Sequence, residues 1–156
     1  MATILSQIVE VCIFRWIADK PQYLLLQRAD DDELYPGIWQ VVTGTMKKNE
    51  SADKAALREL DEETGLRVKR FWTVPFVDSY FDLQNVAVQM VPVFAAEVDA
   101  ALNVRLSCEH RRYEWLEYTA ARERTIWPGQ RQAIEIVHEF IAGGKEAARF
   151  LEITQF

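Results

Sequence analysis

Residues 44–66 read GTMKKNESADKAALRELDEETGL and carry the strongest structural signal in the chain. A loop through Lys47–Asn49 leads into a helix that we predict from about Ser51 to Thr64, and Gly65 suits the left-handed position after a helix end. At about 100° per residue, small and acidic side chains share one face of this helix. The shared stripe consists of Ala52, Ala55, Ala56, Glu59 and Glu63, with Glu62 just beside it.

This acidic stripe is costly in a helix that only has to be stable. Glu59 and Glu63 repel each other four residues apart, and the acids crowd the negative end of the helix dipole. Unpaired charge costs most on the side that faces inward. Spacing alone leaves two interpretations open: a solvated acidic face, or a site where carboxylate oxygens bind Mg²⁺.

The intervals in this stretch carry a family resemblance. Gly44 is followed after five residues by Glu50, and after seven more by the run Arg58–Leu66. Every specified position of the signature G-x5-E-x7-R-E-U-x-E-E-x-G-U is matched, where U is aliphatic. The chain thus resembles the Nudix hydrolases. The resemblance implies one α/β (α+β) domain over residues 1–156, with a mixed β-sheet sandwiched between helices and a loop-helix-loop Nudix box.

The resemblance also implies a role for each residue of the box. Mg²⁺ is the expected cofactor, with Mn²⁺ able to replace it. Glu50 and Arg58 would form an internal ion pair that anchors the loop to the helix. Asn49 departs from the glycine common at its position, but asparagine tolerates the left-handed conformation. The cations would be held by the backbone carbonyl of Gly44 and by Glu59, Glu62 and Glu63.

Shorter matches outside the box resemble the dihydroneopterin triphosphate pyrophosphatase branch, also described as dATP pyrophosphohydrolases. In that branch a glutamate before a histidine completes the metal site, and Glu109 stands at that place, before His110. We expect Glu109 to be a further metal ligand or the general base, unless it is an ordinary loop acid. His110 would orient the loop, and His138 has no predicted role. The catalytic residues implied are Glu63, Glu59 and Glu109, and the matching segments are 39–44, 109–110, 113–116 and 130–134.

Three residues near the loop before the box are candidates for binding substrate. Arg28 carries a guanidinium, which suits bidentate contact with phosphate oxygens. Trp39 would stack on a base or pterin ring, although a tryptophan at a strand start is more often part of the core. Gln40 follows it. Lys47 and Lys48 either touch phosphates or are simply solvated, and we favour the second interpretation.

The implied reaction is hydrolysis of a phosphoanhydride bond. Phosphoryl chemistry needs charge neutralised and a water aimed at phosphorus, which Mg²⁺ ions on a carboxylate cluster provide. By resemblance, dihydroneopterin triphosphate or a (deoxy)nucleoside triphosphate would yield pyrophosphate and a monophosphate. Two alternatives stay open: a dinucleoside polyphosphate or ADP-ribose as substrate of the same box, and a catalytically silent domain that binds nucleotides.

Composition limits the partners. The net charge of −6 argues against bulk nucleic acid as a partner, so we expect a small nucleotide or pterin triphosphate. Cys12 and Cys108 have no metal-binding spacing and fit a reducing compartment. The residues after Met1 lack the features of a signal peptide or membrane span, which predicts a cytoplasmic protein without membrane contact. The oligomeric state stays open.

Apolar periodicity predicts the remaining elements. A turn around Asp19–Pro21 would join the first two strands, and Pro92 would mark a bulge or an edge. Arg131–Ile141 has a helical spacing that ends at Gly143-Gly144. Strands are expected at 8–14, 23–27, 71–77, 86–98, 113–116 and 148–153. A further short strand through residues 39–42 is expected to end at Gly44.

Overall fold

A mixed sheet forms the centre of the computed structural model, which describes residues 1–156. Its nine strands follow the order β4-β3-β2-β7-β6-β9, while β1 pairs with β7, β5 with β2 and β8 with β3. The strands are β1 (Thr3–Leu5), β2 (Ile8–Ile17), β3 (Lys20–Arg28), β4 (Trp39–Gln40), β5 (Val42–Thr45), β6 (Val68–Asp82), β7 (Ala87–Val98), β8 (His110–Glu117) and β9 (Glu152–Ile153).

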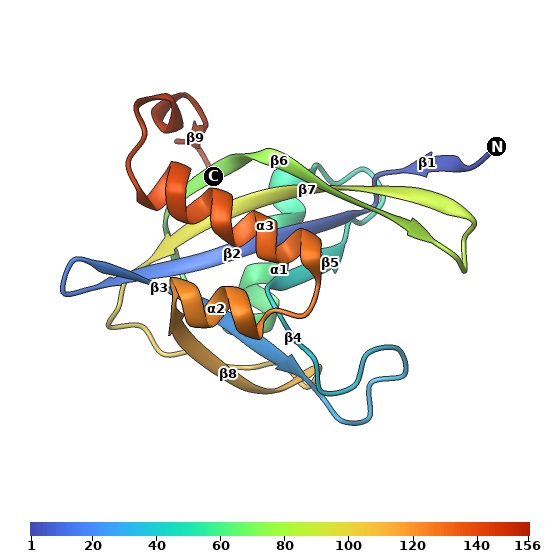
Figure 1. Cartoon of the computed structure of the whole chain (residues 1–156), viewed down its shortest axis with the longest axis horizontal. Coiled ribbons are helices and arrows are strands. Elements are labelled where there is room, and N and C mark those ends of the chain that lie inside the picture. The colour runs from blue at the N-terminus through green and yellow to red at the C-terminus, as the bar shows by residue number, and fades with distance from the viewer.

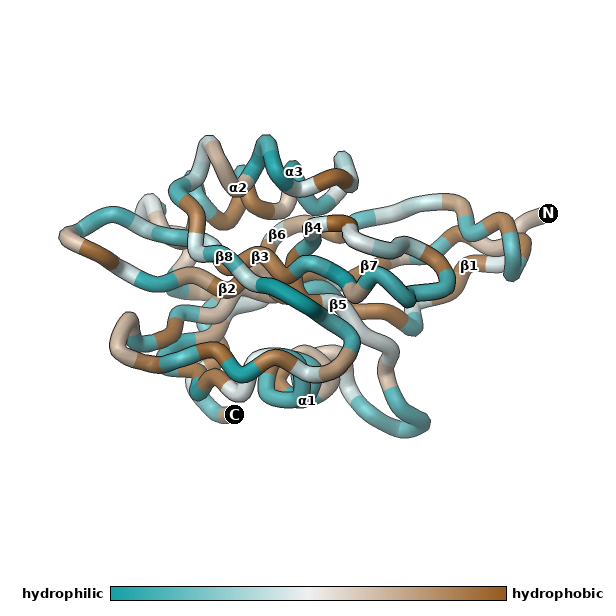
Figure 2. The backbone as a smooth tube through the Cα atoms, turned by 90° about the horizontal axis from the view of Figure 1, so that it is seen from below, coloured by the Kyte–Doolittle hydropathy of each residue, from teal (hydrophilic) through white to brown (hydrophobic).

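Helices cover both faces of this sheet. Figure 1 shows α3 and α2 crossing in front of the strands with α1 behind them, and Figure 2 shows the same three layers from the side. The expected α/β fold, a mixed sheet between helices, is confirmed. The helical segments are α1 (Ala52–Thr64), α2 (Tyr118–Arg124), α3 (Pro128–Ile136), a π-helical continuation (Val137–Ala142) and a 3₁₀ helix (Glu146–Phe150).

The two faces carry two separate apolar cores. In β2, Val9 and Val11 belong to the core that includes Ala55, Ala56 and Leu60 of α1. Cys12 belongs to the other core, together with residues of α2 and α3. This division follows from the strand geometry, because successive side chains point to opposite faces.

The ends of β6 and β7 project from the body as a long hairpin, with β1 beside it (Figure 1). Opposite Pro92 the register shifts between Thr73 and Val77, so the predicted irregularity is confirmed as a bulge.

No helix of this chain is both long and apolar enough to span a bilayer. The extent of the domain, residues 1–156, stays a prediction.

The predicted helix of the box is confirmed as α1, with Gly65 in the left-handed conformation at φ 63°. The predicted strand from Trp39 is corrected, because it is split in two. β4 pairs with β3, whereas β5 pairs with β2. Between them the N–H of Val41 donates to Oε1 of Gln130 (3.2 Å).

Other boundaries also differ from the prediction. The first turn lies at Ala18 and Asp19, both at positive φ (47° and 63°). α3 begins at Pro128 because the fixed φ of proline suits the first helical position. The predicted strand 148–153 is wrong before Glu152, since Ala148 N–H bonds to the Lys145 carbonyl in a 3₁₀ helix. β1 and α2 were not predicted.

Candidate active site

The helix α1 holds its acidic face against the sheet by means of small side chains. Ala55 and Ala56 are fully buried, so the helix axis lies close to the strands beneath it. One turn further on, Leu60 fills the same core. The next inward position is Glu63, which is only 4% exposed. The helix therefore carries a carboxyl group into the protein at its C-terminal end.

Glu63 has no compensating donor in this position. Its Oε2 atom is buried and has no hydrogen-bond partner. Burial, together with the nearby Glu59 and Glu109, raises the pKa of Glu63 to about 9, while Arg28 acts in the opposite direction. A buried acid surrounded by other acids is unfavourable unless a proton or a cation joins it.

The start of β8 brings Glu109 and His110 to Glu63. One ligand atom from each of these three residues lies within 4.8 Å of the other two. The backbone carbonyl of Glu109 accepts from Ala29 N–H (2.9 Å), and His110 pairs with Arg28 across a bulge. The sheet thus joins a loop and a helix that are distant in sequence.

His110 is 5% exposed, and neither ring nitrogen has a hydrogen-bond partner. Burial lowers the pKa of His110 to about 4, with Arg28 contributing, so the ring is neutral near pH 7. A neutral imidazole keeps one nitrogen free to accept and the other to donate. The ring therefore offers both functions beside the two carboxyl groups.

Glu59 lies against Gly44 of β5. A Cβ atom at position 44 would stand 2.0 Å from the carboxyl carbon of Glu59, so no other residue fits there without moving it. Burial raises the pKa of Glu59, although Arg58 donates to it (2.7 Å) and lowers the pKa. The glycine lets the strand backbone and this carboxylate meet directly.

Arg58 ties the loop of the box to α1. Its Nε and Nη2 atoms donate to the two carboxylate oxygens of Glu50, each at 2.8 Å. Nη2 also reaches the Thr45 carbonyl (3.0 Å), and Nη1 reaches Glu62 (3.2 Å). The loop itself turns at Asn49, which has φ 64°. Glu50 and Arg58 thus lie in a bidentate ion pair, and Arg58 also contacts Glu59 and Glu62.

The three substrate candidates do not converge on one point. Arg28 donates to Asp32, so its guanidinium is held within its own loop. Trp39 packs against the core under α2 and α3, with the Arg124 guanidinium 5.1 Å from its ring centre. Gln40 is buried on the opposite face, in register with Leu26, and its Nε2 has no partner.

Sequence reasoning missed a second polar cluster on the face that α3 covers. Glu10 of β2 is 5% exposed and accepts a hydrogen bond from Gln130 (3.2 Å). One signal was available: Glu10 is the only charged residue in the apolar run Ile8–Phe14. Its position in that run points inward, where an acid is unusual.

Comparisons with known proteins agree with this geometry. A family model described as NUDIX domain matches residues 7–137. The octanoyltransferase of Myxococcus xanthus is 32% identical over 134 residues, with 81% of this chain and 35% of that protein covered, so the chain spans about a third of it. The dihydroneopterin triphosphate diphosphatase of Escherichia coli K12 is 30% identical over 142 residues, with 81% of this chain and 89% of that protein covered.

The structure of an Ap4A hydrolase from C. elegans superposes with a TM-score of 0.74 and 23% identity, covering 89% of this chain and 99% of that one. At this identity the likeness concerns the fold. Both proteins share the same layered fold.

Proposed function

The chain belongs to the Nudix family, whose members hydrolyse phosphoanhydride bonds, and we propose that it is a Mg²⁺-dependent pyrophosphohydrolase of nucleoside or pterin triphosphates. The observation that carries the proposal is the buried Oε2 of Glu63, which has no partner and lies among other carboxyl groups. The similarity to the E. coli dihydroneopterin triphosphate diphosphatase supports the substrate class. We also propose a cytoplasmic location, which two unpaired cysteines support.

The residues present fit a hard divalent cation. Glu63 and Glu109 offer carboxylate oxygens within 4.8 Å of each other, and Glu59 lies on the same helix face one turn away. Magnesium prefers oxygen ligands, and it usually joins a few carboxylates with water and substrate phosphates. The Gly44 carbonyl and Glu62 complete the proposed set. In the described structure Arg58 contacts Glu59 and Glu62, so these two carboxylates stay partly neutralised before a cation binds.

Bound Mg²⁺ would neutralise phosphate charge and make an attacking water more acidic. Glu63, held rigidly by α1, keeps its oxygens in the site and excludes water from the inner side. Glu109 lies on an exposed loop beside it and accepts the proton of the attacking water as the general base. His110, the next residue, would orient the loop that carries Glu109. Arg28 would bind a phosphate oxygen after releasing Asp32, its hydrogen-bond partner in this structure.

The test combines one variant with a substrate panel. Purified protein with Mg²⁺ is incubated with dihydroneopterin triphosphate, dATP, dGTP, diadenosine tetraphosphate and ADP-ribose, and products are identified by mass. We expect pyrophosphate and a monophosphate from the triphosphates. Glu63→Gln should lower this turnover by about 10²-fold or more while the protein stays folded, as shown by circular dichroism.

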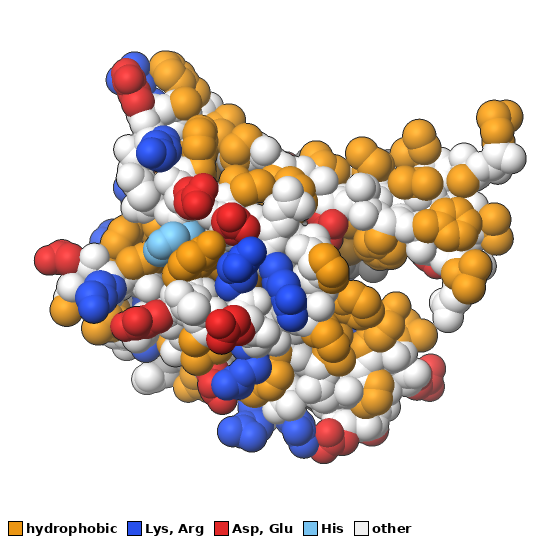
Figure 3. All heavy atoms as spheres, viewed as in Figure 1, with side chains coloured by type: hydrophobic (Ala, Val, Ile, Leu, Met, Phe, Trp, Pro, Cys, Tyr) orange, Lys and Arg blue, Asp and Glu red, His pale blue; other side chains and the backbone are white.

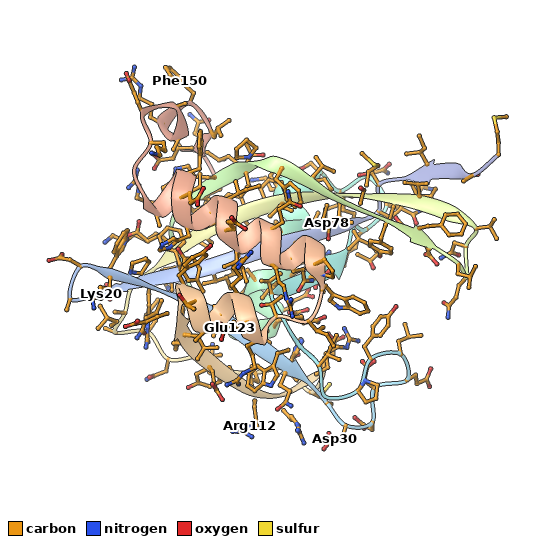
Figure 4. The ribbon with its side chains drawn as sticks, in the orientation of Figure 1. Lys20, Asp30, Asp78, Arg112, Glu123 and Phe150 are labelled. Carbon is orange, nitrogen blue, oxygen red and sulfur yellow. The ribbon has the colours of Figure 1, made fainter.

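Glu123→Gln serves as the control, because Glu123 is an exposed acid on α2, away from the box (Figure 4). It should retain the wild-type rate. Undiminished turnover in Glu63→Gln would remove this residue from the metal site. Nucleotide binding without any product would instead identify a silent domain, and cleavage restricted to diadenosine tetraphosphate or ADP-ribose would change the substrate class.

A further inference from the structure

The hairpin of β6 and β7 extends beyond all the helices, so this part of the sheet has no second layer (Figure 1). Phe94 and Ala96 of β7 belong to the core under α1. Successive side chains of a strand point to opposite faces, so Val88, Met90 and Pro92 lie on the same face further out. The face that α1 covers in the body of the protein thus continues along the hairpin without a helix over it.

Strand pairing extends this face across β6 and β1. Residues directly opposite each other in a sheet lie on the same face. Val77, Ser79 and Phe81 of β6 pair with residues 92, 90 and 88 of β7, and Ile4 of β1 pairs with residue 88. We call this surface the arm face. Its one polar side chain is Ser79, and its apolar residues are Ile4, Val77, Phe81, Val88, Met90 and Pro92.

The arm face exposes large apolar side chains to water. The exposed fractions are 71% for Ile4, 52% for Phe81, 47% for Val77 and 37% for Met90, and the turn adds Leu83 at 80% and Val86 at 61%. A projecting ribbon of two or three strands is marginally stable unless one of its faces is packed. Contiguous apolar surface of this kind marks a site of interaction with another molecule.

The charges of the hairpin limit what can cover the arm face. Residues 76–92 include no Lys or Arg, and Figure 3 shows mainly apolar side chains along the hairpin. The two acids of this segment, Asp78 and Asp82, pair with residues 91 and 87 of β7 and therefore lie on the other face. Surfaces that bind anionic lipid carry Lys and Arg, so a membrane does not fit. The matching partner is itself a flat, apolar and uncharged strand surface, which a second copy of this chain provides.

The area of the arm face is sufficient for such a contact. With about 150 Å² for each fully exposed large side chain, the exposed side chains of the arm face and its turn present roughly 500 Å². Two copies in contact would remove on the order of 1,000 Å² from water, which is the size at which specific interfaces begin. A contact at this lower limit predicts a dissociation constant in the micromolar range.

We propose that the arm face joins two copies of this chain, packed face to face about a twofold axis. A twofold contact uses the same patch on both copies, so the patch must be complementary to itself, as an uncharged apolar surface is. The two hairpins then form two packed sheets about 10 Å apart, and each supplies the layer that the other lacks. The proposal is independent of the proposed function.

Sedimentation velocity on the purified chain tests the proposal. Between about 1 μM and about 100 μM protein, we expect the wild type to change from monomer to dimer. Phe81→Lys places a charge in the contact, and the twofold axis repeats it in both copies, so the dissociation constant should rise by about 100-fold or more. Met90→Lys, on the neighbouring strand of the same face, should have the same effect. Both side chains are exposed in the single copy, so both variants should fold, as circular dichroism can verify.

Tyr80→Lys is the matched control. Tyr80 is adjacent to Phe81 and similarly exposed, at 45%, but it pairs with Gln89 and lies on the opposite face of the hairpin. This variant should dimerise as the wild type does. The general effect of an added positive charge would be the same in all three variants, whereas a contact through the arm face is weakened only by Phe81→Lys and Met90→Lys.

Three results would overturn the proposal. They are a monomeric wild type at every concentration, a dimer that persists in both Phe81→Lys and Met90→Lys, and a dimer that Tyr80→Lys weakens equally. Sedimentation of the monomeric wild type with phosphatidylcholine vesicles would assign the arm face to lipid instead. These measurements need no turnover, so they are decided separately from the pyrophosphohydrolase activity.

Discussion

Glu63 and Glu10 are buried carboxyl groups on opposite faces of one sheet, and their surroundings differ. Glu63 has acids around it: Glu59 and Glu109 add to the effect of burial, and its pKa is about 9. Glu10 has an amide as its nearest partner: Gln130 offsets part of the effect of burial and Asp78, and its pKa is about 8.

The difference indicates what each carboxyl group binds. A cluster of several carboxyl groups, only partly offset by Arg58 and Arg28, concentrates negative charge, which a divalent cation balances best. A buried carboxyl group with a pKa of about 8 is neutral near pH 7 and carries an O–H donor beside its acceptor oxygen. The box face therefore concentrates negative charge, whereas the buried acid on the α3 face is held in its neutral form.

The largest expected effect comes from Gly44→Ala. The new Cβ would force Glu59 away from the strand, because the two would otherwise stand 2.0 Å apart. A displacement of about 1 Å at a catalytic centre costs about 10²-fold in rate, which we expect in kcat for pyrophosphate release. Thr45→Ala, an exposed position on the same strand, is the control. A wild-type rate in Gly44→Ala would show that close contact with Glu59 is unnecessary.

The second prediction concerns stability on the α3 face. Folding raises the pKa of Glu10 from 4.5 to about 8, so the stability from its neutral form is complete below about pH 4.5 and is lost as the pH rises through 8. Glutamine does not titrate. Glu10→Gln should therefore gain on the order of 3 kcal/mol over the wild type between pH 5 and pH 8, a factor of more than about a hundred in the unfolding equilibrium.

Urea unfolding of both proteins at these two pH values measures this gain. A difference that does not change with pH would mean that Glu10 stays ionised in the folded protein. Glu97 is another buried acid of this sheet, and the same experiment on Glu97→Gln gives the change in unfolding free energy expected from replacing such an acid.

A third prediction tests the role of Arg58. Lysine keeps the charge but cannot donate to both oxygens of Glu50 and to the Thr45 carbonyl at the same time. Arg58→Lys should lower kcat by roughly tenfold, as losses of residues that orient metal ligands do, and should reduce the melting temperature. Unchanged activity would show that the ion pair between Arg58 and Glu50 is not needed to orient the metal ligands.

The smallest effect is expected for Lys47→Ala. The Lys47 side chain is 65% exposed, and its nearest acid, Glu62, is 3.8 Å away. Such pairs contribute little, so unfolding free energy should change by less than about 0.5 kcal/mol and KM by less than about twofold. A larger rise in KM would show that Lys47 touches the phosphates of the substrate.

The box was predictable because its geometry is local. Residues 44–66 form one loop and one helix, so the positions of Glu59, Glu62 and Glu63 follow from the helical period. The proximity of Glu109 and His110 to Glu63 depends on the pairing of β8 with β3, and spacing does not reveal this pairing. The resemblance to a known family supplied that contact.

The arrangement of the polar and aromatic residues outside the box was not predictable in the same way. Trp39 and Gln40 are adjacent in sequence, but a strand turns them to opposite faces. The partner of Arg28, Asp32, is set by the conformation of the loop. Glu10, Asp78 and Gln130 come from three distant segments, and their relation depends on burial and on the start of α3 at Pro128.

The loop 29–38 touches the carbonyl of Glu109 at one end and Trp127 at the other. An insertion or deletion within it would alter both contacts and leave residues 44–66 intact. A change in the length of this loop can therefore alter the surroundings of Glu109 without any change in the box.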